Sequence, residues 1–184
     1  MTAPVLADGL CLMQRDEADM LWDQVVLNAP HWVLEIGTNK GGSALVICDA
    51  LRQMEYDAHL ITLDPCDNRD PDLWAQIEPT GLFINQASPS GTATAYALAG
   101  ALFDLVFIDG HHSLESVRAD IDGVLPVLRV GSVILFHDAH YDDVRCAIDE
   151  AVKRHALRDD GLIAGAPVGG PDEWWGGLRR VMKP

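Results

Sequence analysis

The sequence predicts an α/β fold with a doubly wound, mainly parallel sheet and an antiparallel hairpin at its C-terminal end. Three observations support this prediction: short apolar runs alternate with helical patterns, a glycine-rich turn links the first run to a helix, and glycine and proline interrupt the last stretch. The length of 184 residues fits one domain. Within it we expect a helical extension over residues 1–29, an α/β core over 30–161 and a terminal hairpin over 162–184.

The spacing of apolar residues places the elements along the chain. A helix is expected over residues 16–28, with Asp16 as its cap and Pro30 after its end. Two further helices, over 43–54 and 142–155, each bury one apolar stripe. Strands are expected at residues 32–36, 60–63, 82–84, 105–108 and 133–136.

Two later segments carry helix-breaking residues. Residues 113–128 follow a helical pattern, which Gly123 and Pro126 should bend or shorten, and Gly131 is expected to end it. The stretch 162–182 contains two short apolar runs separated by glycines and prolines. It predicts an antiparallel hairpin with a long loop.

The most informative motif is the turn after the first strand. Glu35 precedes Gly37, and Gly41 and Gly42 follow just before a helical pattern. Glycines let the backbone approach a ligand closely, and the helix presents unpaired amides at its start. These features indicate a nucleotide-type cofactor pocket, although the dinucleotide signature G-x-G-x-x-G is absent.

This turn resembles motif I of the class I S-adenosylmethionine-dependent methyltransferases. The resemblance implies their Rossmann-like fold and S-adenosyl-L-methionine (SAM) as cofactor, with the turn around its amino-acid end. It also places Asp64, after the second strand, at the ribose hydroxyls, and Gln86 or Ser88 at the adenine, where Ala87 replaces an acid common in the family. The implied cofactor contacts are Glu35, Gly37, Thr38, Asn39, Gly41, Gly42, Ser43, Asp64, Gln86, Ser88 and Asp109.

Polar clusters end the fourth and fifth predicted strands. Asp109 follows residue 108, and His137 and Asp138 follow residue 136. If these strands are neighbours, the three side chains meet at one edge of the sheet. Carboxylates and imidazoles packed together without a counter-charge would be costly, so the cluster predicts a divalent metal.

The stretch 109–112 and the pair that follows residue 136 resemble the cephalosporin-hydroxylase, macrocin-type and catechol-type branch of small-molecule O-methyltransferases. The resemblance implies a metal held by Asp109, His137 and Asp138, either magnesium or, because imidazole suits a softer ion, one such as manganese. It also places His112 where catechol-type relatives carry their base. Histidine can accept a hydroxyl proton near neutral pH, so the expected catalytic residues are His112, Asp109 and, as the alternative base, His111.

Composition restricts the partners. The net charge is −15, and residues 1–100 contain four basic residues, so binding to a nucleic acid is not expected. No stretch is long and apolar enough to span a bilayer, and residues 1–12 lack the pattern of a secretion signal, which favours a cytoplasmic protein without membrane contact. The four dispersed cysteines predict neither disulfides nor a zinc site.

We therefore expect a SAM-dependent, metal-assisted O-methyltransferase for a small hydroxylated molecule: a natural product, a sugar or a phenol. A metal-dependent hydrolase and a non-catalytic cofactor-binding subunit are the alternatives. Tyr141 is a candidate for the acceptor pocket, whereas Trp174 and Trp175 are expected to pack on the sheet rather than to wall the acceptor. The apolar first helix and these tryptophans make a homo-oligomer reasonable.

Overall fold

The computed structural model describes residues 3–4, 11–170 and 173–184. The absence of a secretion signal, expected from residues 1–12, therefore concerns positions that lie mostly outside the described residues. None of the helices in these ranges is long and apolar enough to cross a membrane. The elements, in chain order, are α1 (Arg15–Asn28), β1 (Trp32–Ile36), α2 (Gly42–Leu51), β2 (His59–Leu63), α3 (Pro71–Ile77), β3 (Gly81–Ile84), α4 (Ser90–Ala99), β4 (Phe103–Ile108), α5 (Leu114–Val124), the 3-10 turn η1 (Leu125–Val127), β5 (Leu128–Phe136), α6 (Asp142–His155), β6 (Arg158–Ala164), β7 (Val168–Gly170), β8 (Glu173–Trp175) and β9 (Leu178–Met182).

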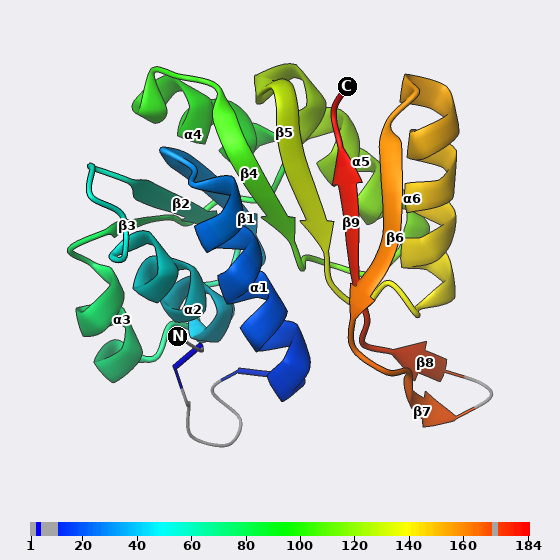
Figure 1. The fold of residues 1–184 in the computed structure, drawn as a ribbon, viewed down its shortest axis with the longest axis horizontal. Coiled ribbons are helices and arrows are strands. Elements are labelled where there is room, and N and C mark those ends of the chain that lie inside the picture. The colour runs from blue at the N-terminus through cyan, green and yellow to red at the C-terminus, as the bar shows by residue number, and fades with distance from the viewer. Residues whose placement is uncertain (1–2, 5–10, 171–172) are drawn as a thin grey trace.

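The main sheet has seven strands in the order β3-β2-β1-β4-β5-β9-β6 (Figure 1). Strands β1 to β5 pair in parallel, whereas β9 runs antiparallel to both β5 and β6. The predicted doubly wound sheet with a C-terminal antiparallel hairpin is therefore confirmed. Because β1 lies between β2 and β4, the chain reverses its direction of winding at β1, and the crevice at this point opens at the carboxyl ends of these strands.

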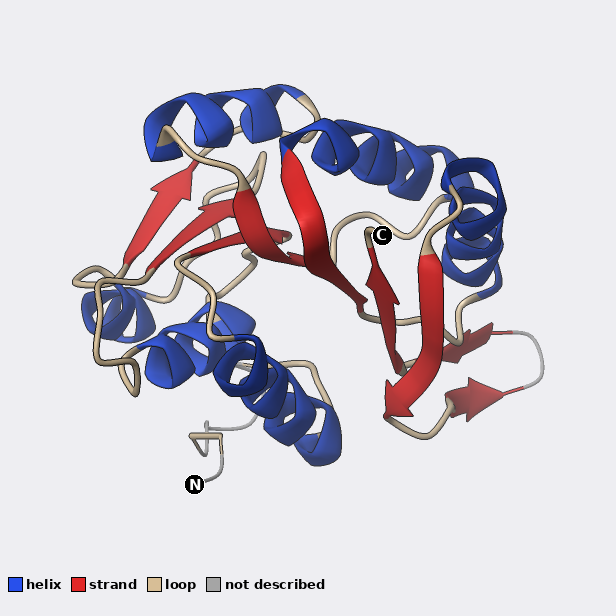
Figure 2. Cartoon of the chain, turned by 45° about the horizontal axis from the view of Figure 1, so that its top comes forward, coloured by secondary structure: helices blue, strands red, loops and turns tan. Residues whose placement is uncertain are grey.

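Helices cover both faces of the sheet (Figure 2). Helices α1, α2 and α3 pack on one face, and α4, α5 and α6 on the other. Successive strand residues supply the two cores in turn: Val33 packs with the first group of helices and Leu34 with the second. This alternation follows from the two-residue period of a strand, and it explains why the buried strands appear as continuous apolar runs.

The first helix begins one residue before its predicted start. Its cap is Gln14, not Asp16, because the side chain of Glu17 turns back and accepts the backbone N–H of Gln14 at 2.7 Å. Ala29, in a left-handed conformation, ends the helix before Pro30.

Two short helices had no residue range in the prediction. Helix α3 begins at Pro71, and the carboxyl group of Asp70 caps it by accepting the N–H groups of Asp72 and Leu73, each at 3.0 Å. Helix α4 is built mostly of small residues and buries three of them, Gly91, Thr92 and Ala95. Neither segment has a long apolar stripe, the pattern on which the predictions relied.

The prediction that Gly131 ends the fifth helix is wrong. Helix α5 ends at Val124, and Pro126 lies in the 3-10 turn that follows. Gly131 instead lies within β5, where its φ is +85° and its N–H donates to the carbonyl oxygen of Lys183 at 2.8 Å. Gly123 and Pro126 are thus sufficient to end the helix without Gly131. Strand β5 starts at Leu128, before the apolar run at residues 133–136 that predicted it.

The terminal hairpin starts at Arg158, before the predicted residue 162. Strands β6 and β9 form it, and β7 pairs antiparallel with β8 in a separate two-stranded sheet between them. Figure 1 shows this small sheet beyond the lower ends of β6 and β9. The carboxyl end of β5 and the N-terminal end of α1 lie beside the start of β9, as the hydrogen bonds below show.

Candidate functional site

The turn after β1 packs against the end of β4. Gly37 has φ +97°, and a Cβ atom at this position would lie 2.0 Å from the carbonyl oxygen of Asp109. Its N–H donates to the carbonyl oxygen of Leu63 at 2.8 Å. Gly41, with φ +98°, caps α2. Both the dihedral angle and the contact with Asp109 restrict position 37 to glycine.

Glu35 lies beneath this turn and is fully buried. Its carboxyl group accepts the hydroxyl hydrogens of Ser43, at 2.6 Å, and Thr62. Burial raises its pKa to about 8, against the effect of these two hydrogen bonds. Glu35 was expected among the cofactor contacts, but its side chain lies behind the turn and lines neither of the cavities described next.

Two cavities lie at the carboxyl end of the sheet and share Gly37, Asn39, Asp109 and Gly110. The first, of about 560 Å³, lies toward α1, α2 and the small sheet. The second, of about 490 Å³, lies toward the ends of β2 and β3 and toward α5. The predicted site residues divide between them. Thr38, Gly42, Ser43, His112, His137 and Asp138 line the first cavity; Asp64, Gln86, Ser88 and His111 line the second.

Asp64 is fixed by the backbone at the end of β2. Its Oδ2 accepts the N–H of Asn39 at 3.0 Å, and its Oδ1 accepts the N–H of Cys66 at 2.8 Å. An ionised carboxylate has about four acceptor positions, so capacity for two further hydrogen bonds remains. Asp64 thus stabilises the turn before Pro65. Its carboxylate also forms an oriented acceptor in the wall of the second cavity.

The polar ends of β4 and β5 meet as predicted, because these strands are neighbours. The Nδ1 atom of His137 lies 3.1 Å from Oδ1 of Asp109 and 3.3 Å from Oδ2 of Asp138. One ligand atom from each of the three residues lies within 4.8 Å of the others. Asp138 is held by the N–H of Gly176, which donates to its Oδ1 at 2.6 Å.

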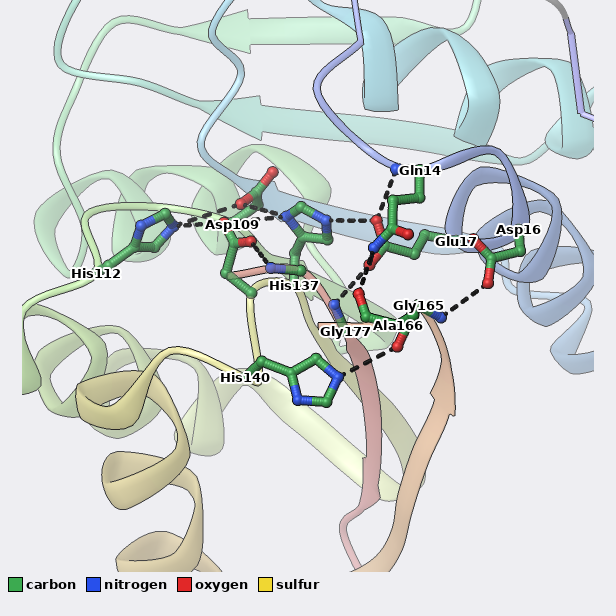
Figure 3. A network of polar contacts seen from close by, with 12 residues as sticks. Gln14, Asp16, Glu17, Asp109, His112, His137, His140, Gly165, Ala166 and Gly177 are labelled. Atoms are coloured by element: carbon green, nitrogen blue, oxygen red, sulfur yellow. Dashed lines mark hydrogen bonds and ion pairs between the residues drawn. The ribbon is translucent and has the colours of Figure 1, made fainter. Parts of the chain in front are cut away.

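A fourth residue completes the cluster, and the sequence did not point to it. Glu17, in the first turn of α1, is 0% exposed. Its Oε2 lies 3.0 Å from Nε2 of His137, and its Oε1 accepts the N–H of Gly177 at 2.6 Å. Figure 3 shows His112, Asp109, His137 and Glu17 in a row that ends at α1. Glu17 therefore joins the N-terminal helix and the terminal hairpin to the predicted metal ligands.

The charges in this cluster depend on one another. Burial alone would lower the pKa of His137, but Asp109, Asp138 and Glu17 around its ring raise it overall. Burial alone would raise the pKa of Asp138. The pKa is nevertheless lowered, because His112, His137 and the N–H of Gly176 all favour the carboxylate. Without a bound cation, the imidazolium of His137 is the counter-charge of the buried carboxylates.

The structure separates the two candidate bases. Nε2 of His112 lies 3.0 Å from Oδ2 of Asp138, and the ring faces the first cavity. The neighbouring carboxylates of Asp109 and Asp138 raise its pKa to about 9. His111 instead faces the second cavity, and its Nδ1 lies 3.2 Å from Oγ of Ser113. Only His112 therefore lies beside the predicted metal ligands.

Aromatic side chains form part of the first cavity. The ring of Tyr141 lies 5.6 Å from that of His112, and Trp175, 39% exposed, lines the same cavity. The expectation that Trp174 and Trp175 pack on the sheet is wrong, because both belong to β8 in the small sheet and stay well exposed. A long loop sequence does not show which surface its aromatic residues will reach.

The donor atoms of the cluster fit a divalent cation. Ligands at about 2.1 Å from an ion are separated by about 3 Å when they occupy adjacent positions. The separations around Nδ1 of His137 are 3.1 and 3.3 Å, and all three donor atoms lie within 4.8 Å of one another. A metal-bound histidine usually donates its other ring N–H to a carboxylate, the position that Glu17 occupies. One nitrogen with two carboxylates suits manganese, iron or zinc better than magnesium.

Comparisons with known proteins give independent evidence on the family and the fold. A family model described as a methyltransferase domain matches residues 34–139, which is more than half of the chain. Rhamnosyl O-methyltransferases of Mycobacterium bovis and Mycobacterium tuberculosis are 28% identical over 115 residues, which cover 60% of this chain and 46% of theirs. The chain therefore spans about half the length of these curated relatives.

Solved structures share the fold. An O-methyltransferase from Bacillus cereus in complex with SAH has a TM-score of 0.70 at 16% identity, over 91% of this chain and 80% of that one. TomG from Streptomyces achromogenes, an O-methyltransferase of tomaymycin synthesis in complex with SAM, has a TM-score of 0.68 at 16% identity, over 96% and 83%. The predicted class I methyltransferase fold is thereby confirmed.

Proposed function

Because this chain belongs to the methyltransferase-domain family, whose model matches residues 34–139, we propose that it transfers a methyl group from SAM to a hydroxyl group of a small molecule. The observation that carries the proposal is the pair of cavities that meet where Gly37 touches the backbone of Asp109. One cavity holds the oriented carboxylate of Asp64, and the other holds His112 beside a cluster of carboxylates. A methyl donor and an acceptor can therefore face each other across Gly37.

The second cavity accommodates the adenosine part of the cofactor in this proposal. Asp64 accepts hydrogen bonds from the ribose hydroxyls through its remaining lone pairs. The amino-acid end lies along the turn of Thr38 and Asn39 and the amides that begin α2. Glu35 supports the turn through Ser43 and Thr62 and does not touch the ligand.

Asp109, His137 and Asp138 are the proposed ligands of a divalent metal. A bound ion would supply positive charge that polarises the acceptor hydroxyl group and lowers its pKa. Glu17 accepts the Nε2 hydrogen of His137, which leaves Nδ1 directed at the two carboxylates. The N–H of Gly176 holds Asp138 in place. The protein thus presents its donor atoms already oriented, which lowers the entropic cost of binding.

His112 is the proposed base. Its Nε2 takes the proton of the acceptor hydroxyl, and the freed oxygen forms a bond to the methyl carbon. The bond from this carbon to sulfur breaks, and its electron pair stays on sulfur, which leaves S-adenosylhomocysteine. The chain contributes chiefly by orientation, since Gly37 and Asp109 bring donor and acceptor into line.

The acceptor enters the first cavity between polar and aromatic residues. Tyr141 and Trp175 offer flat apolar surface, and His112 marks the end where the hydroxyl group must lie. The rhamnosyl O-methyltransferases favour a sugar hydroxyl, and the aromatic wall is equally suited to a phenol. The charge of −15 disfavours a nucleic acid as acceptor.

A transfer assay tests this proposal. The chain is incubated with methyl-labelled SAM and a panel of rhamnosides, catechols and phenols, with and without a chelator. The expected result is label in a hydroxylated product, equimolar S-adenosylhomocysteine and loss of both with the chelator. A hydrolase would cleave a substrate without SAM, and a binding subunit would bind S-adenosylhomocysteine without turning over any acceptor.

A further inference from the structure

Helix α5 carries a buried carboxyl group that the proposed mechanism does not use. The face that α5 turns toward the core includes Val117, Ile121 and Val124, all apolar, and Asp120 lies among them at 6% exposure. An acid on such a face is costly unless it has a specific partner. Asp120 lines the second cavity, so the energetic cost is incurred where the cofactor is proposed to bind.

The surroundings of Asp120 hold its carboxyl group in place. A Cβ atom on Gly110 would lie 3.1 Å from Oδ2 of Asp120, so the acid packs directly under the end of β4. A Cβ atom on Gly123 would lie 2.7 Å from Cβ of Pro89, so α5 packs against the turn after β3. Burial raises the pKa of Asp120 to about 6, although the nearby hydroxyl group of Ser88 acts in the opposite direction.

The other polar groups in this wall are less suited to accept a hydrogen bond from a ligand. The side-chain carbonyl oxygen of Gln86 accepts the hydroxyl hydrogen of Thr94 at 2.8 Å, and Ala87 has no polar side-chain atom. Glu115 also lines the cavity but is exposed at its rim. Among the cavity residues that the structure describes, Asp120 is the one acid that is almost fully withdrawn from water.

We propose that Asp120 determines the base specificity of the cofactor by accepting a hydrogen bond from the exocyclic amine of adenine. This inference rests on the proposed function. Apolar residues such as Leu63 and Ala119 in the same wall suit the faces of a flat purine. An adenine amine offers hydrogen atoms, whereas a 6-oxo purine offers lone pairs at the same place, and these would oppose the carboxylate. A buried acceptor left facing another acceptor is strongly unfavourable.

A comparison of two ligands on three proteins tests this role. Calorimetry at pH 8 measures the affinities of S-adenosylhomocysteine and S-inosylhomocysteine for the wild-type chain, D120N and E115Q. The wild type should prefer the adenosine ligand about 10- to 100-fold. In D120N this preference should fall to about 3-fold or less, because an amide can either accept from an amine or donate to a carbonyl. E115Q removes a charge from the rim of the same cavity and should keep the wild-type ratio.

The ratio of the two affinities separates base recognition from structural damage, because a distorted pocket binds both ligands more weakly by a similar factor. A D120N ratio equal to that of the wild type would overturn the role of Asp120. If D120N does not fold, the wild-type ratio decides, since a ratio near one is incompatible with an acid that reads the amine. If the wild type binds neither ligand, the proposed function itself fails, and that result differs from binding without discrimination.

Discussion

Replacing Gly37 by alanine should disrupt the turn between the two cavities more than an ordinary glycine substitution. The residue has φ +97°, and a left-handed conformation costs an alanine about 1 to 2 kcal/mol. The added Cβ would also lie 2.0 Å from the carbonyl oxygen of Asp109, so one backbone segment must move. Such overpacking costs about 1 to 3 kcal/mol, which gives a total of about 2 to 5 kcal/mol.

Two other glycines allow these contributions to be separated. Gly131 has φ +85° with open space around its Cβ position, so G131A carries the conformational cost alone. Gly41 has φ +98° and would meet the flexible end of Ile77 at 3.1 Å, so G41A should be intermediate. Urea unfolding gives the free energy of unfolding of each variant, and calorimetry gives the affinity for S-adenosylhomocysteine.

We expect G37A to be destabilised by more than G131A, by about 1 to 3 kcal/mol, and to lose at least about 10-fold in affinity because the backbone of Asp109 shifts. G131A lies far from the cavities and should bind as the wild type does. If G37A is no less stable than G131A and binds with wild-type affinity, the contact between positions 37 and 109 does not organise the site.

Four further outcomes are expected. D64A should weaken S-adenosylhomocysteine binding by about 1 to 3 kcal/mol in calorimetry, while D67A, on the same loop, should not; equal effects would count against a ribose contact. Chelation, or D109A, should abolish methyl transfer in the labelled assay but leave cofactor affinity nearly unchanged, and undiminished turnover without metal would remove the metal from the account. H112Q should slow the chemical step about 10²- to 10⁴-fold, and the wild-type rate should rise with pH because His112, whose pKa is raised to about 9 in the cluster without metal, must lose its proton. Glu35 has its pKa raised from 4.5 to about 8, so the folded state holds a proton that the unfolded state releases, and this group should lower the free energy of unfolding by about 1.4 kcal/mol per unit as pH rises between these values; in E35Q the fall measured by unfolding curves should be less steep by about that amount, while the contribution of Asp120 stays.

The strands were predictable because each is an apolar run whose residues are buried in the cores on both faces of the sheet. Val33 and Leu34 point to opposite faces and are both buried. Because both faces are covered, the strand sequence is a continuous run of large apolar residues. Helix α3 lacked a range in the prediction although Asp70 and Pro71 provide a cap and a first residue. Its seven residues are too few for a periodic stripe to appear.

The approach of Asp109 to His137 and Asp138 was predictable from topology, because neighbouring parallel strands end at the same edge of a sheet. Glu17 was not, because it meets a residue 120 positions away, and only the packing of α1 beside the hairpin brings it there. Its sequence signal, an acid three residues after the cap, is shared with ordinary helix starts. Asp120 likewise appeared only as an interruption of an apolar stripe.

A crystal structure of the chain with S-adenosylhomocysteine and Mn²⁺ would show whether cofactor and metal meet at Gly37 and Asp109. We expect ribose density within hydrogen-bonding distance of Asp64 and the sulfur atom beside Gly37. Anomalous density for manganese is predicted between Asp109, Asp138 and Nδ1 of His137, with Glu17 still on the opposite ring nitrogen. A ligand bound outside the two cavities, or a metal placed away from these three residues, would contradict this arrangement.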